Sequence, residues 1–217
     1  MTEKKLLTRV KLLLSGPQIF NFQVIDVAGG TGDIAFRLQR RLLSGGKVTV
    51  VDINQSMLDV GQERGKKDPK VDMSKLEWVC ANAEKLPFED DSFDLYTISF
   101  GIRNCTHVDQ VVKEAFRVLK PGGTLAVLEF SAINPLLRPF YNAYSFNVIP
   151  VMGQVLAGDY DSYKYLVESI RKFPNQEEFA TMIRATGFEM VRYENLTFGI
   201  CAIHKGVKPY KAKKDAQ

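Results

Sequence analysis

The sequence predicts an α/β fold in which helices cover both faces of a largely parallel β-sheet. Three observations lead to this prediction. Strand-like runs alternate with helical patterns as far as Glu129, and the connections between them are short. The strand-like runs are continuously apolar, as expected of strands buried on both faces. A glycine turn, residues 29–32, follows the first strand, at the sheet edge where such folds bind ligands.

Each element is expected from its own residue pattern. The apolar β-favouring runs predict strands at residues 22–28, 47–51, 76–80, 93–99 and 124–129. Patterns of helical period predict helices at residues 33–43, 55–63 and 108–119, with Asp33 expected as the N-cap of the first. Residues 134–186 are helical in pattern and rich in aromatic side chains. Two last runs, 188–194 and 198–204, predict an antiparallel hairpin at the end of the sheet.

Length and composition indicate one domain over residues 1–217. A basic amphipathic helix is expected within residues 1–21, where packing on its own domain is favoured over lying on a membrane. The lysine-rich tail, 206–217, is expected to be solvated and is not interpreted as a nucleic-acid site. Three cysteines and two histidines without metal-ligand spacing argue against disulfides and metal sites. No secretory signal and no apolar run of about 18 residues is present.

The glycine turn carries the strongest ligand signal. Residues 30–35, Gly-Thr-Gly-Asp-Ile-Ala, fit the pattern G-x-G-x-x-G/A, and Asp52 lies 20 residues past Gly32 at the end of the second strand. A carboxylate there can accept hydrogen bonds from both hydroxyls of a ribose. We therefore expect an adenosine ligand. In the alternative interpretation, the glycines only make a tight turn and Asp52 only caps a helix.

The polar residues that follow the third and fourth strands favour one adenosine cofactor. A dinucleotide enzyme normally has a second mononucleotide half, for which this chain has neither the length nor a second glycine loop. Asn82-Ala83 could instead pair with adenine, and Ser99 could face the cofactor. These features fit S-adenosyl-L-methionine, whose amino-acid end would lie over the glycine loop. A small NAD-dependent reductase is the second enzyme hypothesis.

The order of these motifs resembles that of class I methyltransferases, and specifically the UbiE family of ubiquinone/menaquinone ring C-methyltransferases. Residues 99–104, Ser-Phe-Gly-Ile-Arg-Asn, and residues 117–131 are the most specific of the matching stretches, and the resemblance covers about residues 24–206. It implies a doubly wound, Rossmann-like class I methyltransferase sheet of order 3-2-1-4-5-7-6, with a helical insertion between strands five and six. It also implies S-adenosyl-L-methionine as the cofactor, held by Asp26, Gly29, Gly30, Thr31, Gly32, Asp52, Asn82, Ala83 and Ser99.

The implied reaction is C-methylation of a polyprenyl benzoquinol ring in ubiquinone biosynthesis. Arg103, at the mouth of the crevice, could stabilise a phenolate or order a water, and Asn104 could orient either partner. In the alternative, Arg103 pairs with a surface carboxylate. His107 could act as a base, but a solvated residue at a helix start is preferred. Glu129 could fix the loop or the substrate hydroxyl, and His204 is expected in the core.

The same resemblance suggests partners and a location. The expected partners are a lipophilic polyprenyl quinol, other quinone-biosynthesis proteins and a membrane surface, with a homodimer left open. Residues 148–153 and 158–162 resemble mitochondrial members, which favours the matrix side of the mitochondrial inner membrane, or the cytoplasm in a bacterium. The Tyr-Asp-x-Met-Asn signature that usually precedes the first strand and helps to cover the cofactor is absent. A non-catalytic subunit of a quinone-biosynthesis complex therefore stays as an alternative. Menaquinone ring methylation also stays as an alternative, because the sequence does not separate the two pathways by chemistry alone.

Overall fold

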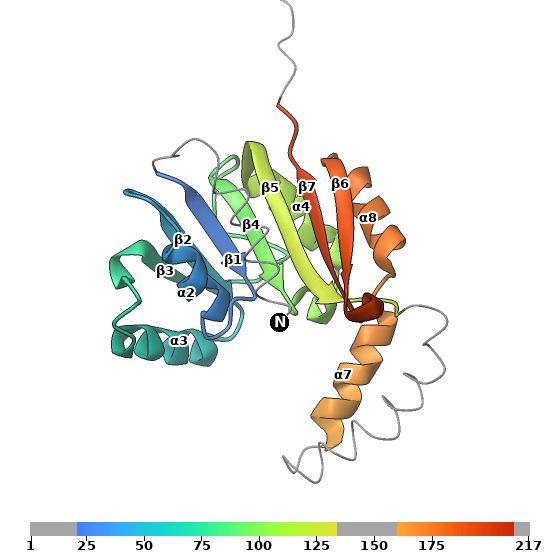
Figure 1. Ribbon diagram of the computed structural model, residues 1–217, viewed down its shortest axis with the longest axis horizontal. Coiled ribbons are helices and arrows are strands. Elements are labelled where there is room, and N and C mark those ends of the chain that lie inside the picture. The colour runs from blue at the N-terminus through green and yellow to red at the C-terminus, as the bar shows by residue number, and fades with distance from the viewer. Residues whose placement is uncertain (1–20, 134–159, 211–217) are drawn as a thin grey trace, which may run out of the picture.

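The computed structural model describes residues 21–133 and 160–210, and among these residues seven strands form one sheet (Figure 1). Its order, β3-β2-β1-β4-β5-β7-β6, is the predicted one. The first five strands are parallel, and β7 is antiparallel to both of its neighbours. The strands are β1 (Gln23–Val27), β2 (Lys47–Asp52), β3 (Leu76–Cys80), β4 (Phe93–Ser99), β5 (Leu119–Phe130), β6 (Glu189–Leu196) and β7 (Cys201–Val207).

Helices cover both faces of this sheet, as predicted. The described helices are α2 (Asp33–Gln39), α3 (Gln55–Lys67), α4 (Val108–Val118), α7 (Tyr160–Lys172) and α8 (Gln176–Ala185). Three short 3-10 turns accompany them, η1 (Met73–Lys75), η2 (Ile102–Asn104) and η3 (Thr197–Gly199). The predicted N-terminal helix, residues 134–159 of the aromatic segment and residues 211–217 of the tail lie outside the described residues.

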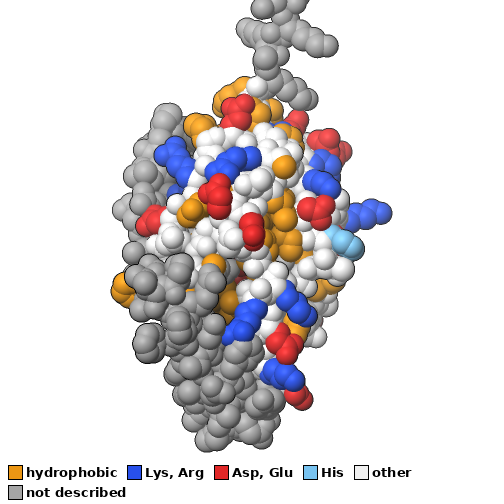
Figure 2. Space-filling view, turned by 90° about the vertical axis from the view of Figure 1, so that its right-hand side faces the viewer, with side chains coloured by type: hydrophobic (Ala, Val, Ile, Leu, Met, Phe, Trp, Pro, Cys, Tyr) orange, Lys and Arg blue, Asp and Glu red, His pale blue; other side chains and the backbone are white. Residues whose placement is uncertain are grey.

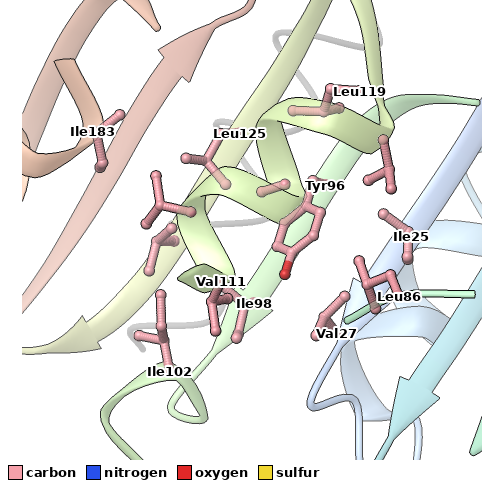
Figure 3. Packing of buried hydrophobic residues seen from close by; sticks show 14 of the residues in the cluster. Ile25, Val27, Leu86, Tyr96, Ile98, Ile102, Val111, Leu119, Leu125 and Ile183 are labelled. Atoms are coloured by element: carbon pink, nitrogen blue, oxygen red, sulfur yellow. The ribbon is translucent and has the colours of Figure 1, made fainter. Parts of the chain in front are cut away.

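Alternation along the strands divides the core between the two faces. Ile25 and Tyr96 belong to a buried cluster with α4 and α8, whereas Val24 and Leu95 belong to a second cluster with α2 and α3. Figure 3 shows the Tyr96 ring inside the first cluster, among aliphatic side chains of the strands and α4. Burial on both faces fixes the strand register, and so aligns the carboxyl ends of β1, β2 and β4 at one edge.

Two helix boundaries differ from the prediction. The first helix was expected to reach residue 43, but α2 ends at Gln39. The buried Gln39 side-chain amide donates to the carbonyl oxygens of Phe36 (3.1 Å) and Lys70 (3.0 Å). It therefore competes with the backbone N–H of the next helical turn for the Phe36 carbonyl oxygen. The second helix, expected to end at residue 63, continues to Lys67 as α3.

The fifth strand begins earlier than predicted. Residues 120–123 were expected to close the preceding helix, but β5 already starts at Leu119. Its pairing with β4 shifts, because Leu119 is opposite Phe93 and Thr124 is opposite Leu95. The intervening Lys-Pro-Gly-Gly segment therefore forms a bulge within the strand.

The start of the tail is also more ordered than predicted. Residues 206 and 207 belong to β7, and Lys208 is buried rather than solvated. The Lys208 Nζ donates to Asp91 Oδ1 (2.6 Å) and to the carbonyl oxygen of Leu119 (2.7 Å). The terminal hairpin is antiparallel as predicted, with β6 and β7 joined through η3.

The molecular surface at the β6 edge mixes charges of both signs. Figure 2 shows basic and acidic side chains interspersed with apolar ones on the described part of this face, without a stripe of one sign. Within residues 21–133 and 160–210, no helix has the length and apolar character needed to cross a membrane.

Candidate functional site

A pocket of about 210 Å³ opens at the carboxyl ends of β1 and β4. It is smaller than a typical small-molecule site, so it can enclose one part of a larger ligand. Three segments line it: the β1 end with the glycine turn, the start of α2 and the β4 end. The lining residues are Asp26, Ala28, Gly29, Thr31, Asp33, Ile34, Ser99 and Phe100.

The backbone at this pocket is strained at two neighbouring positions. Ala28 and Phe100, which directly follow the adjacent strands β1 and β4, have φ values of 50° and 57°, in the left-handed region that most side chains avoid. Strain of this kind costs about 1–3 kcal/mol per residue and concentrates at functional sites. Gly101 permits the close approach, because a Cβ on it would lie 2.3 Å from that of Ala28. The pocket wall therefore depends on both turns together.

The glycine turn lies directly beside Asp52, as predicted. Gly30 has a φ of 52°, and its N–H donates to Asp52 Oδ2 at 2.9 Å. Asp52 Oδ1 accepts a hydrogen bond from the backbone N–H of Asn54, also at 2.9 Å. A Cβ on Gly29 would lie 2.6 Å from Val50 Cγ1, so this position requires glycine. Each carboxylate oxygen of Asp52 has a second lone pair with which it can accept a ligand hydroxyl.

The predicted N-cap role of Asp33 is wrong. Gly32 is the N-cap of α2, in a left-handed conformation with a φ of 83°, and Asp33 is the first helical residue. The Asp33 carboxylate instead accepts a hydrogen bond from Arg64 Nη2 of α3 at 2.9 Å. Only glycine adopts this N-cap conformation freely, so the turn sequence moved the cap by one residue.

Asp26 presents an unpartnered carboxylate oxygen to the pocket. The residue is 1% exposed, and its Oδ1 accepts a hydrogen bond from Thr97 Oγ1 at 2.6 Å. Its Oδ2 is buried without a partner, as is Ser99 Oγ at the end of β4. Burial, partly opposed by the Thr97 hydrogen bond, raises the pKa of Asp26 to about 7. A ligand ammonium in this pocket would pair with Asp26 and remove the unpartnered charge.

Asn82 and Ala83, which are predicted to bind the adenine, lie further along the same sheet edge. Asn82 is exposed after β3, and its Oδ1 accepts the N–H of Glu84 at 2.9 Å, which leaves the side-chain NH₂ available. The backbone joins this turn to β2, because Ala81 N–H donates to the Asp52 carbonyl oxygen at 3.0 Å. Ala83 follows in the same turn. The order along the edge is therefore Ser99, the glycine turn, Asp52 and Asn82.

Two apolar residues at this edge were missed by the sequence reasoning. Ile53, directly after Asp52, is 72% exposed, and Met57 on α3 is 42% exposed. Met57 Cε lies 3.4 Å from the position that a Cβ on Gly30 would occupy. Large exposed apolar side chains beside a polar site fit the flat face of a nucleobase. The available signal was an apolar residue directly after Asp52.

Arg103 lies in η2, directly after β4, and is bound to a buried carboxylate. Its Nη1 lies 2.9 Å from Glu129 Oε1, with side-chain exposures of only 9% and 2%. The same Nη1 donates to the carbonyl oxygen of Phe100, and the guanidinium lies 5.1 Å from the Phe130 ring centroid. The alternative of a surface carboxylate partner is thus wrong, because Glu129 is buried. Glu129 fixes the loop, one of its two predicted roles.

The other candidate residues differ in their surroundings. Asn104 Oδ1 lies 3.5 Å from Tyr165 Oη of α7. His107 is the N-cap residue of α4, with a 66% exposed side chain and Nδ1 2.8 Å from Glu84 Oε2, so the preferred solvated interpretation holds. His204 is buried, with Nε2 2.9 Å from the Gln176 carbonyl oxygen, as expected of a core histidine. Among the described residues, no group of three acidic, histidine or cysteine side chains forms a metal site.

Sequence comparison relates this chain to a known protein family. The model of the ubiE/COQ5 methyltransferase family matches residues 5–208. The chain is 65% identical over 192 residues to the Caenorhabditis elegans protein named "2-methoxy-6-polyprenyl-1,4-benzoquinol methylase, mitochondrial", which covers 88% of this chain and 67% of the relative. It is 55% identical over 196 residues to the Bartonella henselae protein named "Ubiquinone/menaquinone biosynthesis C-methyltransferase UbiE". This match covers 90% of this chain and 75% of the relative.

Solved structures share the fold at low sequence identity. Haemonchus contortus phosphoethanolamine N-methyltransferase 2, solved in complex with S-adenosyl-L-methionine, superimposes with a TM-score of 0.70 at 19% identity, covering 95% of this chain and 53% of that chain. The CMeT domain of the citrinin polyketide synthase superimposes with a TM-score of 0.70 at 13% identity, and the match covers 96% of this chain and 52% of that chain. The chain therefore belongs to the ubiE/COQ5 methyltransferase family and is an S-adenosylmethionine-dependent methyltransferase.

Proposed function

We propose that this chain methylates a ring carbon of a polyprenyl benzoquinol in ubiquinone biosynthesis. The names of two mitochondrial relatives support this substrate. The observation that carries the proposal is the row of unpartnered and partly partnered polar groups at one sheet edge. Asp26 and Ser99 have buried oxygens without partners in the pocket, and Asp52 lies beside the same glycine turn.

The proposed cofactor residues contact three parts of the ligand, which are its amino-acid end, its ribose and its base. The pocket takes the amino-acid end, with Asp26 bound to the ammonium and the glycine turn, residues 29–32, beneath it. Asp52 accepts hydrogen bonds from the ribose hydroxyls, and Asn82-Ala83 bind the base, with Ile53 against its face. When bound, S-adenosylmethionine would supply an electrophilic methyl group. Ser99 and Phe100, which line the pocket at the β4 end, are among the residues that would hold the cofactor.

Arg103 is proposed to stabilise negative charge on a substrate oxygen. A guanidinium keeps its proton in proteins, so Arg103 does not serve as an ordinary base. The buried Glu129 and the Phe100 carbonyl fix its Nη1, while its Nε has no partner in the protein. A fixed cation in a site of low dielectric favours the phenolate, which makes the ring carbon nucleophilic. Asn104, beside Arg103, is proposed to orient the ring oxygen.

We further propose that the chain is one domain that binds a membrane surface. A polyprenyl chain partitions into a bilayer, so the enzyme must meet its substrate there. The word "mitochondrial" in the names of relatives supports the mitochondrion, and the matrix side of the inner membrane is our specific proposal, with the bacterial cytoplasm as the counterpart. Other quinone-biosynthesis proteins are the proposed partners, and a homodimer stays a prediction.

A methylation assay with two ring types tests the substrate. Purified chain, S-adenosylmethionine and vesicles that contain a short-tailed benzoquinol or naphthoquinol are incubated, and the product is analysed by mass spectrometry and NMR. We expect a new ring C–methyl group on the benzoquinol, with Arg103→Lys reducing turnover at least tenfold and leaving cofactor affinity within about twofold. Methylation of the naphthoquinol alone would favour the menaquinone alternative, and methylation at oxygen would contradict the proposal.

A further inference from the structure

Arg64 of helix α3 donates hydrogen bonds to Thr31 of the glycine turn and to Asp33, the first residue of α2. Its Nη1 donates to both the hydroxyl oxygen and the carbonyl oxygen of Thr31. Its Nη2 donates to Asp33 Oδ1 at 2.9 Å. Thr31 and Asp33 line the pocket, whereas Arg64 itself does not. Any effect of Arg64 on a bound ligand must therefore pass through these two residues.

The hydrogen bond from Arg64 decides how the Thr31 hydroxyl can act. A hydroxyl group has one hydrogen to donate and lone pairs with which to accept. Arginine only donates, so Thr31 Oγ1 is the acceptor in this bond. Its own hydrogen is therefore available to another acceptor, and among the described residues the structure shows no hydrogen bond donated by this hydroxyl. Arg64 thus leaves Thr31 as a donor toward the pocket.

Arg64 also balances an unfavourable charge. The Asp33 carboxylate is on the pocket lining, where it would repel an anionic ligand group. The Arg64 guanidinium pairs with it and supplies the opposite charge at the same place. The Asp26 carboxylate, which also lines the pocket, has an oxygen without a partner. The pocket lining therefore offers both an acid for an ammonium and a hydroxyl donor for a carboxylate.

We propose that Arg64 is a positioning residue that makes Thr31 the hydrogen-bond donor for the α-carboxylate of the cofactor. The inference depends on the proposed placement of the amino-acid end in the pocket. It explains why an arginine that lies outside the pocket is bound to the pocket-lining Thr31 on both its side chain and its backbone. Lysine at this position can donate to the Thr31 hydroxyl but cannot reach several acceptors as a planar fork.

Two ligands that differ only at the amino-acid end test this role. S-adenosylhomocysteine carries the carboxylate, and 5′-methylthioadenosine lacks the whole amino-acid part. By calorimetry, Arg64→Met should weaken S-adenosylhomocysteine about tenfold and change methylthioadenosine less than twofold, since one charge-assisted interaction is worth about a factor of ten. Thr31→Val should have the same pattern. Because Arg64→Met also leaves the charge of Asp33 unpaired, the double variant is compared in an Asp33→Asn background, where it should be no weaker than Thr31→Val alone. Arg64→Lys should recover part of the loss.

Controls separate positioning from a loss of structure. Arg40→Met removes an arginine of similar exposure that pairs with Asp68 at 2.8 Å, away from the pocket, and should leave both affinities unchanged. Trp78, the single tryptophan of the chain, packs on Gly32, so its emission reports an altered turn. Equal weakening of both ligands by Arg64→Met, or additive losses in the double variant, would overturn the inference. If the folded parent bound neither ligand, the proposed cofactor site itself would fail, which is a distinct result.

Discussion

Asp26→Asn should make the free protein more stable while weakening its binding of cofactor. The Asp26 carboxylate is buried, and one of its oxygens has no hydrogen-bond partner. Asparagine keeps an oxygen that can accept the Thr97 hydrogen bond, and its NH₂ group replaces one unpartnered atom with another. The substitution therefore removes mainly the buried charge.

The size of the effect follows from the pKa of Asp26, which burial raises from 3.8 to about 7. Because the folded state holds this proton more tightly, stability falls as the pH rises between these two values. Each pH unit is worth about 1.36 kcal/mol, so above pH 7 the ionised carboxylate costs about 4 kcal/mol. The asparagine variant lacks this cost, and its advantage should be about 4 kcal/mol at pH 8 and about 2 kcal/mol at pH 5.

Urea unfolding of the ligand-free parent and variant at both pH values measures this difference. Asp59→Asn, an exposed carboxylate that accepts a hydrogen bond from Gln55, serves as the control and should change stability little at either pH. The affinity of Asp26→Asn for S-adenosylhomocysteine should fall at least tenfold, because the ligand ammonium loses its charge partner. An Asp26→Asn variant that is no more stable than the parent at pH 8, or equally stabilised at both pH values, would refute the reasoning.

Two further predictions concern Glu129 of β5 and His107 at the start of α4. Glu129→Gln should lower the free energy of unfolding by about 3 kcal/mol, because Arg103 would stay buried without an opposite charge. Urea unfolding at pH 7 tests this value, and a change below about 0.5 kcal/mol would show that the ion pair contributes little. His107→Ala should alter turnover less than twofold, since the side chain is 66% exposed and only meets Glu84. A hundredfold loss in the methylation assay would instead identify His107 as a general base.

The sequence predicted the strand order and the bounds of β3 and β4, because these depend on local apolar runs and on the motif order of a known family. Boundaries set by distant contacts were not predictable. The end of α2 depends on the Gln39 amide reaching the Lys70 carbonyl, 31 residues away. The start of β5 depends on a bulge opposite β4, and the order of the tail depends on Lys208 reaching Asp91.

The candidate site divides in the same way. The motif placed Asp26, Asp52 and Ser99 at one sheet edge, because parallel strands bring their carboxyl ends together. The sequence could not show that Arg103 pairs with Glu129, since 26 residues separate them and the contact forms only when β4 and β5 align. The sequence also could not show the hydrogen bond from Arg64 to Thr31, because the two residues are 33 positions apart in the chain.

Calorimetric titration of S-adenosylhomocysteine into the parent and into Asp52→Ala tests the central claim most directly. In this account Asp52 both binds the ribose hydroxyls and holds the N–H of Gly30. Two charge-assisted hydrogen bonds, each worth about 1.5–3 kcal/mol, predict a loss of affinity of about a hundredfold or more. Asp59→Ala, which removes an exposed carboxylate of α3, should bind like the parent. Equal affinity in Asp52→Ala and the parent, or no binding to a folded parent, would contradict the proposed site.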